Sequence, residues 1–251
     1  NTEVELLFKS KDVGVFQKRY KLLNNYFYGF SKAIYTGNSE KKFKLEELAP
    51  LNSEYSHFIL IDKIIYFTLF SSSEKVYKLM SYDGKFFQEV ERNQDPIYAL
   101  PVNSVPYRCI LSEEATSFRS LVSNDHEKTF PEAFFPIYMR SLSDFYFTRP
   151  EDGGLFRYNY TKVTRILPAN KGESRNEGRY YLYNDSKVLT LYDLEKQHTP
   201  VMVTTAMKSA AYKAYSEDSH SLYIAGGNQF QRLFTYLKCY PRLYNKTNSD
   251  G

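Results

Sequence analysis

The sequence predicts an all-β fold, predominantly β with at most minor helix, and three observations lead to that prediction. The 251 residues include 24 Tyr and 19 Phe, and aromatic side chains favour pleated, half-buried strands. Short aromatic or β-branched runs alternate with turn-type residues along most of the chain. Long amphipathic helical patterns are scarce, so strands must bury most of the core.

Length and composition favour one domain, a single β-rich domain spanning 1–251. Hydrophobic residues make up 42% of the chain and charged residues 25%, which are ordinary values for a globular protein. Antiparallel β folds reach this length as one domain. A chain of this composition can bury enough apolar surface to offset the entropy lost on folding.

Paired runs closed by turn residues predict hairpins. The clearest pair is 180–183 and 188–192, which flanks the turn Asn-Asp-Ser-Lys at 184–187. Five similar pairs occur elsewhere: 33–35 before 43–45, 63–66 before 76–79, 107–111 before 117–119, 144–147 before 154–158, and 222–225 before 230–234.

The spacing of these hairpins predicts a repeating architecture. One residue from each hairpin serves as an anchor, and the intervals between them average about 38 residues, close to the ~40 to 50 of one propeller blade. Six such units would form a six-bladed β-propeller; a β-sandwich or another multi-hairpin β architecture is the alternative. A mixed α+β fold stays open because 22–33 and 206–217 could be helical. The anchors are Ile34, Ile64, Arg108, Phe145, Tyr180 and Leu222.

The segment 123–130, with the sequence SNDHEKTF, resembles the Asp-box of sialidase-like and sortilin-like propellers. Glu127 stands where the box has Gly, and poorer echoes start at 36, 81 and 216. The resemblance implies a hairpin turn whose Ser and Asp side chains hold the backbone. It implies architecture alone, because the arginine pattern of the sialidases is absent from the sequence.

The sequence offers no catalytic constellation. It contains no GxSxG, HExxH, GxxxxGK[ST] or GxGxxG motif. The four histidines are dispersed at positions 57, 126, 198 and 220. Two cysteines are too few for a zinc site. We therefore expect no catalytic residue, no metal ligand and no cofactor.

Charge and hydropathy exclude two classes of partner. A net charge of +4, with Lys and Arg scattered among nearly as many Asp and Glu, argues against nucleic-acid binding. No stretch reaches the ~18 uninterrupted apolar residues of a membrane helix. The sequence thus predicts a soluble chain that does not insert into a membrane.

Cysteines and sequons predict a protein that is secreted or lies on the extracellular face of a membrane. Cys109 and Cys239 could form one disulfide bridge. Asn159, Asn184 and Asn245 each begin an N-glycosylation sequon.

These expectations combine into a function. The chain should be an extracellular, non-enzymatic recognition module that binds a protein or glycan partner through loops or an aromatic-rich face. Segments without periodicity at 91–106, 124–136 and 170–178 are the loops expected to make contact. A glycan-processing hydrolase on a propeller and a subunit of a larger assembly are the alternatives. The sequence leaves the oligomeric state open.

Overall fold

The protein is all-β across the part of the chain that the structure describes. The computed structural model describes residues 13–22, 25–38, 43–123, 126–170, 174–175, 178–205, 210–218, 221–228 and 233–239. Every regular element in these ranges is a strand, and within them no helix has the length and hydropathy needed to cross a membrane. Helix formation at 22–33 is excluded, because that segment forms strands, as does the described part of 206–217.

The chain divides into two compact units, Asn1–Ala133 and Phe134–Gly251, called unit 1 and unit 2 below. The single domain expected over 1–251 stays a prediction, and each unit is described by itself.

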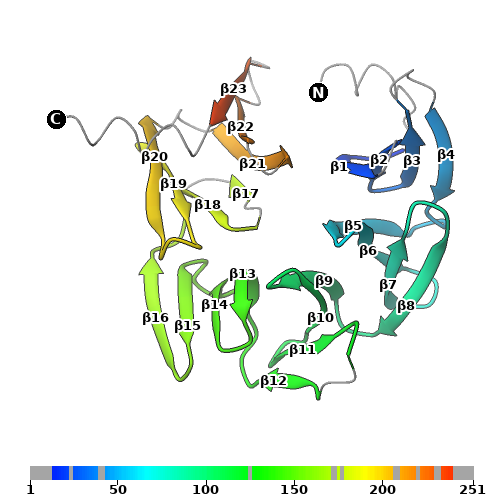
Figure 1. Ribbon diagram of the computed structural model, residues 1–251, viewed down its shortest axis with the longest axis horizontal. Coiled ribbons are helices and arrows are strands. Elements are labelled where there is room, and N and C mark those ends of the chain that lie inside the picture. Colours follow the sequence, from blue (N-terminus) through cyan, green and yellow to red (C-terminus); the bar gives the residue numbers. More distant parts are fainter. Residues whose placement is uncertain are drawn as a thin grey trace. The chain divides into compact units, whose positions relative to one another are not determined.

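Unit 1 consists of three antiparallel meanders of four strands, which follow one another from blue to green in Figure 1. Successive meanders pack face to face, since β5 contacts β1 and β2 of the first meander and β9 contacts β5, β6 and β7 of the second. The strands are β1 (Phe16–Leu22), β2 (Asn25–Phe30), β3 (Ala33–Gly37), β4 (Phe43–Leu48), β5 (Glu54–Ile61), β6 (Ile64–Ser71), β7 (Val76–Tyr82), β8 (Phe87–Asn93), β9 (Ile97–Val102), β10 (Val105–Leu111), β11 (Thr116–Ser120) and β12 (Lys128–Phe130).

Unit 2 follows a similar plan, but one of its two meanders has four strands and the other has three. Two meanders are followed by a third group of strands, in which the short strand β17 pairs in parallel with β21. The strands are β13 (Phe135–Ser141), β14 (Asp144–Thr148), β15 (Leu155–Asn159), β16 (Lys162–Leu167), β17 (Ser174–Arg175), β18 (Tyr180–Asn184), β19 (Val188–Asp193), β20 (Thr199–Thr205), β21 (Ala210–Asp218), β22 (Ser221–Asn228) and β23 (Leu233–Cys239).

The predicted hairpins are confirmed. The described residues of all six pairs of runs lie on consecutive antiparallel strands, for example β18 with β19 and β6 with β7. The six anchors fall on β3, β6, β10, β14, β18 and β22, which is one strand in each meander. The repeat inferred from spacing therefore reflects the strand order of both units.

Aspartate side chains close several of the hairpins. Between β18 and β19, the Oδ1 atom of Asp185 accepts hydrogen bonds from the backbone N–H groups of Lys187 (2.8 Å) and Val188 (2.6 Å). Asp83, in the Asp-box echo between β7 and β8, does the same for Lys85 (2.8 Å) and Phe86 (2.9 Å). A short carboxylate that binds amides two and three residues on fixes a turn without help from tertiary packing.

The prediction of a loop over 91–106 is wrong. β8 continues to Asn93, β9 occupies Ile97–Val102, and β10 begins at Val105. The charged residues at 91 and 92 suggested a loop, but they lie on an outer strand, where charge protects the unpaired edge. Strands β12 and β17 likewise interrupt the segments 124–136 and 170–178.

Candidate binding site

A buried arginine lies in the core of unit 1. Arg108, on β10, is only 3% exposed. Its Nη2 atom donates to Glu127 Oε2 (2.6 Å) and its Nη1 atom to Ser117 Oγ (3.2 Å). Its Nε atom lies 3.2 Å from Glu91 Oε1 without the alignment of a hydrogen bond. A buried guanidinium is tolerated only with such partners, because the loss of hydration costs several kcal/mol.

A second arginine lies directly opposite the first. Arg119, on β11, pairs in register with Arg108, so the two side chains share one face of the sheet. Glu91 reaches them from β8 of the preceding meander, and its Oε2 atom accepts a hydrogen bond from Arg119 Nη2 (2.6 Å). Like charges opposite each other would destabilise the strand pair. One carboxylate from the preceding meander offsets that repulsion and ties the two meanders together.

A hollow opens beside this ion cluster, within unit 1. Its volume is about 460 Å³, and its walls come from the outer strand β8 and from β11 with the residues that follow. Ser120 shapes the wall, because its Oγ atom accepts hydrogen bonds from the backbone N–H groups of Val122 and Ser123. The lining residues are Val90, Glu91, Arg119, Ser120, Leu121, Val122 and Ser123.

The electrostatics of the cluster suit binding better than proton transfer. The hydrogen bond from Arg108 holds the pKa of Glu127 below its ordinary value, so this carboxylate stays charged at neutral pH. A general acid needs the opposite shift. Glu127 is also the residue that departs from the Asp-box pattern, and its ion pair with Arg108 gives that departure a structural role.

Unit 2 contains a second ion network, between the meanders β13–β16 and β18–β20. Arg157 binds Asp144 with two hydrogen bonds (2.8 and 3.0 Å), and Arg140 adds a third (3.1 Å). Arg140 also donates to the backbone oxygen of Leu194 across the two meanders (2.9 Å). Among the described pockets none is lined by these residues, so we treat the network as a structural link.

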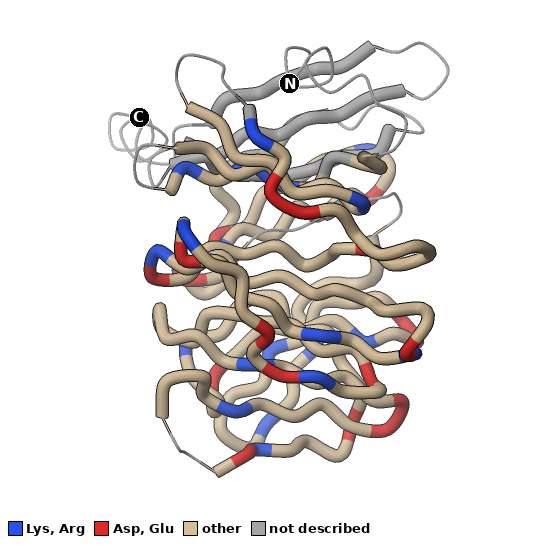
Figure 2. The backbone as a smooth tube through the Cα atoms, turned by 90° about the vertical axis from the view of Figure 1, so that its right-hand side faces the viewer, with Lys and Arg blue, Asp and Glu red and all other residues tan. Residues whose placement is uncertain are grey.

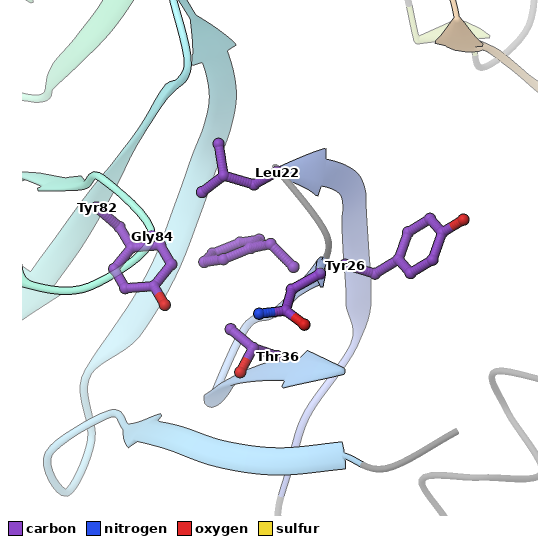
Figure 3. A pocket seen from close by; sticks show the side chains of 7 residues that line it. Leu22, Tyr26, Thr36, Tyr82 and Gly84 are labelled. Carbon is purple, nitrogen blue, oxygen red and sulfur yellow. The ribbon is translucent and has the colours of Figure 1, made fainter. Parts of the chain in front are cut away.

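A second hollow in unit 1 is too small to act as a ligand site. Figure 3 shows it between the first two meanders, with Leu22 on one side and Tyr82 on the other. Its volume of about 30 Å³ corresponds to room for a water molecule. The described residues also contain no group of His, Cys, Asp or Glu side chains that could hold a metal ion.

Charge is otherwise distributed without a dominant sign. Figure 2 shows Lys and Arg interspersed with Asp and Glu along the described backbone. Position within a hollow, and not a large charged surface, therefore distinguishes Arg119 and Glu91 from the other charged residues.

The structure describes the side chain of only one of the two cysteines in the predicted disulfide. Cys109 is buried on β10, beside Arg108, and burial raises the pKa of its thiol to about 12. Cys239 ends β23, and the structure describes its backbone but not its side chain. The Cys109–Cys239 bridge stays a prediction.

The three sequons differ in their surroundings. Asn159 is exposed at the end of β15. Asn184 is 3% exposed, and its Oδ1 atom accepts a hydrogen bond from the backbone of Ser186. Asn245 lies outside the described residues. Glycosylation stays a prediction at all three positions, and Asn159 has the most accessible side chain of the two that are described.

Sequence reasoning missed the ion cluster beside the hollow. Its members, at positions 91, 108, 119 and 127, come from three separate strands and the segment before β12, and from two meanders. One signal was present: Arg108 and Arg119 interrupt otherwise uncharged strand runs, and a charge in such a run needs a partner.

Comparisons with known proteins show the architecture. The sequence matches no protein-family model and no curated protein. Its structure is similar to that of streptogramin B lyase, with a TM-score of 0.59, 10% identity, and coverage of 93% of this chain and 86% of that one. The fold is β-propeller-like.

Two further structures share this likeness. One is PorZ, a bacterial surface component of the type-IX secretion system of Porphyromonas gingivalis, with a TM-score of 0.53, 9% identity, and coverage of 91% of this chain and 33% of that one. The other is BBS1N in complex with ARL6DN, with a TM-score of 0.51, 7% identity, and coverage of 87% and 75%. Identities this low establish the fold alone.

Proposed function

We propose that this protein is a recognition module that binds a protein partner through the hollow beside Arg119. One observation carries the proposal: a hollow of about 460 Å³ on a rigid β framework, with an ion pair inside it and exposed apolar side chains, Val90 and Val122, in its wall. Pockets that recognise ligands combine apolar walls with a few placed polar groups in this way.

The comparison with BBS1N supports the choice of partner. That propeller-like structure contains a second protein, ARL6DN. β-propeller-like folds host unrelated functions, so the likeness shows only that such a scaffold can present a protein-binding surface. The mixed lining of the hollow suits the side chains of a polypeptide.

We further propose that the protein acts outside the cell. The exposed sequon at Asn159 supports this, because oligosaccharide is added to accessible Asn-X-Ser/Thr positions in the secretory pathway. A deglycosylation shift in the mass of the secreted protein, lost on Asn159→Gln, is the expected result.

Binding to intact cells tests the proposed function. Fluorescent tetramers of the secreted protein should stain cells that display the partner. Val122→Asp should abolish staining, since Val122 is 69% exposed in the wall of the hollow. The matched control is Thr164→Asp, at an exposed position on β16 in unit 2.

The two variants carry the same charge change, so they separate the hollow from general electrostatics. Loss of staining with Val122→Asp alone supports the hollow as the binding site. Equal staining by both variants and the wild-type protein contradicts it, and so does equal loss.

A further inference from the structure

We propose that the hollow of unit 1 recognises a carboxylate, presented by an acidic side chain of the partner, through the guanidinium of Arg119. This inference rests on the proposed function and names the chemistry of the partner segment. An acidic stretch of polypeptide is the occupant that the lining favours.

Arg119 has N–H donors beyond the one that binds Glu91. A guanidinium carries five N–H donors in a planar fork. Toward the part of the chain that the structure describes, Arg119 makes one hydrogen bond, from Nη2 to Glu91 Oε2 (2.6 Å). Its side chain is 45% exposed and lines the hollow. Nη2 carries two hydrogens, one on the edge shared with Nε and one on the edge shared with Nη1. Whichever hydrogen Glu91 accepts, the other edge can therefore meet an incoming carboxylate.

Glu91 is the group that would be expected to repel such a ligand, and its environment weakens that repulsion. One of its oxygens faces Arg108 (3.2 Å) and the other faces Arg119 (2.6 Å). Two guanidiniums therefore share this one carboxylate within the wall. Glu127 binds Arg108 at its far nitrogen, is 42% exposed, and is not among the lining residues, so water screens its charge.

Buried Arg108 gives the site its rigidity. Its hydrogen bonds to Ser117 and Glu127 hold the Arg108 guanidinium in place. Its Nε atom faces Glu91, and Glu91 in turn orients the Arg119 side chain. A guanidinium held in one orientation loses less conformational entropy when it binds a carboxylate than a freely rotating one.

The remaining walls fit the rest of an acidic side chain. Val90 and Val122 supply apolar surface on two sides of the hollow, against which the methylene groups of Glu can pack. The volume of about 460 Å³ falls within the ~300 to 1,000 Å³ of ligand pockets. Glutamate thus combines the two features that the lining recognises.

A pair of labelled peptides tests the inference directly. Fluorescein-labelled hexaglutamate and hexaglutamine have the same length and differ in charge. Fluorescence anisotropy at a fixed ionic strength should show that the wild-type protein binds hexaglutamate at least about tenfold more tightly, the effect of one charge-assisted contact.

Three variants locate the contact. Arg119→Gln should weaken hexaglutamate binding about tenfold. Arg92→Gln, which removes the same charge from an exposed position on β8 outside the lining, should leave binding within about twofold. Val122→Glu places a carboxylate at the wall without touching the ion cluster, and it should weaken binding to a similar extent as Arg119→Gln. This last variant keeps the test decisive if Arg119→Gln fails to fold.

The outcomes separate this inference from the proposed function. Equal affinity for the two peptides, or equal losses with Arg119→Gln and Arg92→Gln, overturns carboxylate recognition. If tetramers still stain cells in a manner that depends on Val122, the binding module stands and only the chemistry of its ligand is wrong. Hexaglutamate competing for that staining is the result expected from both proposals together.

Discussion

His198 shows how a single residue in unit 2 couples folding to pH. Its Nδ1 atom lies 3.2 Å from the hydroxyl of buried Tyr146. His198 ends a turn in which both Gln197 and His198 have positive φ values, of 56° and 54°. Burial lowers the pKa of His198, and the charge of Arg157 lowers it further. The imidazole is therefore kept neutral in the folded protein at neutral pH.

We predict that the free energy of unfolding falls as the pH drops below about 6.5, the ordinary pKa of histidine in an unfolded chain. Below that pH the unfolded state takes up a proton that folded His198 resists, so acid favours unfolding. Above it the contribution is complete. Urea titrations at pH 7.5 and 5.5 measure the change.

His198→Gln removes the titrating group and should reduce the loss of stability between these pH values. The decrease should be partial, because burial also lowers the pKa of His57 in unit 1. His126→Gln, at an exposed position before β12, is the matched control. An unchanged pH dependence in His198→Gln would refute the assignment.

At the scale of elements, a glycine on β2 shows how closely the first two meanders pack. A Cβ atom added to Gly29 would meet ring atoms of Phe58 at 2.8 to 2.9 Å. Phe58 is buried in the core cluster that joins the two meanders and stacks on Phe67 at a ring distance of 5.4 Å. The ring also contacts Phe27 and Tyr55, so a methyl group at position 29 would have to displace a packed side chain.

We predict that Gly29→Ala destabilises the protein by about 1 to 3 kcal/mol through overpacking. Phe58→Leu should reduce that cost in the double variant, because the smaller side chain leaves room for the added methyl group. Gly178→Ala is the control: its φ of +56° strains any Cβ, but no atom lies within 4 Å. Chemical denaturation of the wild-type protein, the two single variants and the double variant gives the coupling energy between positions 29 and 58. Additive effects of the two substitutions would contradict the packing argument.

The elements that sequence predicts well are those whose cause is local. The hairpin β18–β19 follows from alternating aromatic residues around a turn that Asp185 closes with its own neighbours. The assignment of 22–33 to a possible helix failed because β1 and β2 are stabilised by pairing with each other and with β3. That pairing cannot be deduced from the periodicity of a single segment.

The candidate binding site could not be predicted for the same reason. Glu91, Arg108 and Arg119 meet only when β8 of one meander packs against β10 and β11 of the next. Each is an ordinary charged residue in its own stretch of sequence. Spacing revealed the repeat, but the side chains that two repeats bring together depend on their packing.

At the scale of the whole molecule, the propeller-like fold suits a recognition module. Antiparallel meanders give a rigid framework, and residues on their outer strands can vary without disturbing the core. The ion cluster of unit 1 and the network of unit 2 each link consecutive meanders. The charges that link the meanders of unit 1 and those that line its hollow thus come from the same set of strands.

The Cys109–Cys239 bridge would add a covalent link between a residue of unit 1 and a residue of unit 2. In the chain-entropy model a loop of this length stabilises the fold by about 4 to 5 kcal/mol. We predict that the protein secreted from eukaryotic cells has a mass two protons below that of the reduced chain and takes up no alkylating reagent. Its denaturation midpoint should fall when a reductant is present.

The buried position of Cys109 gives the opposite outcome its own signature. With its pKa raised to about 12, a free Cys109 stays protonated at pH 8. Alkylation of the native protein would then be slow at Cys109, and a second adduct would appear only after unfolding. Intact-mass measurements before and after denaturant therefore distinguish a bridged protein from one with two thiols. A second adduct that appears on denaturation without reductant would exclude the bridge and remove one of the two supports for an extracellular protein.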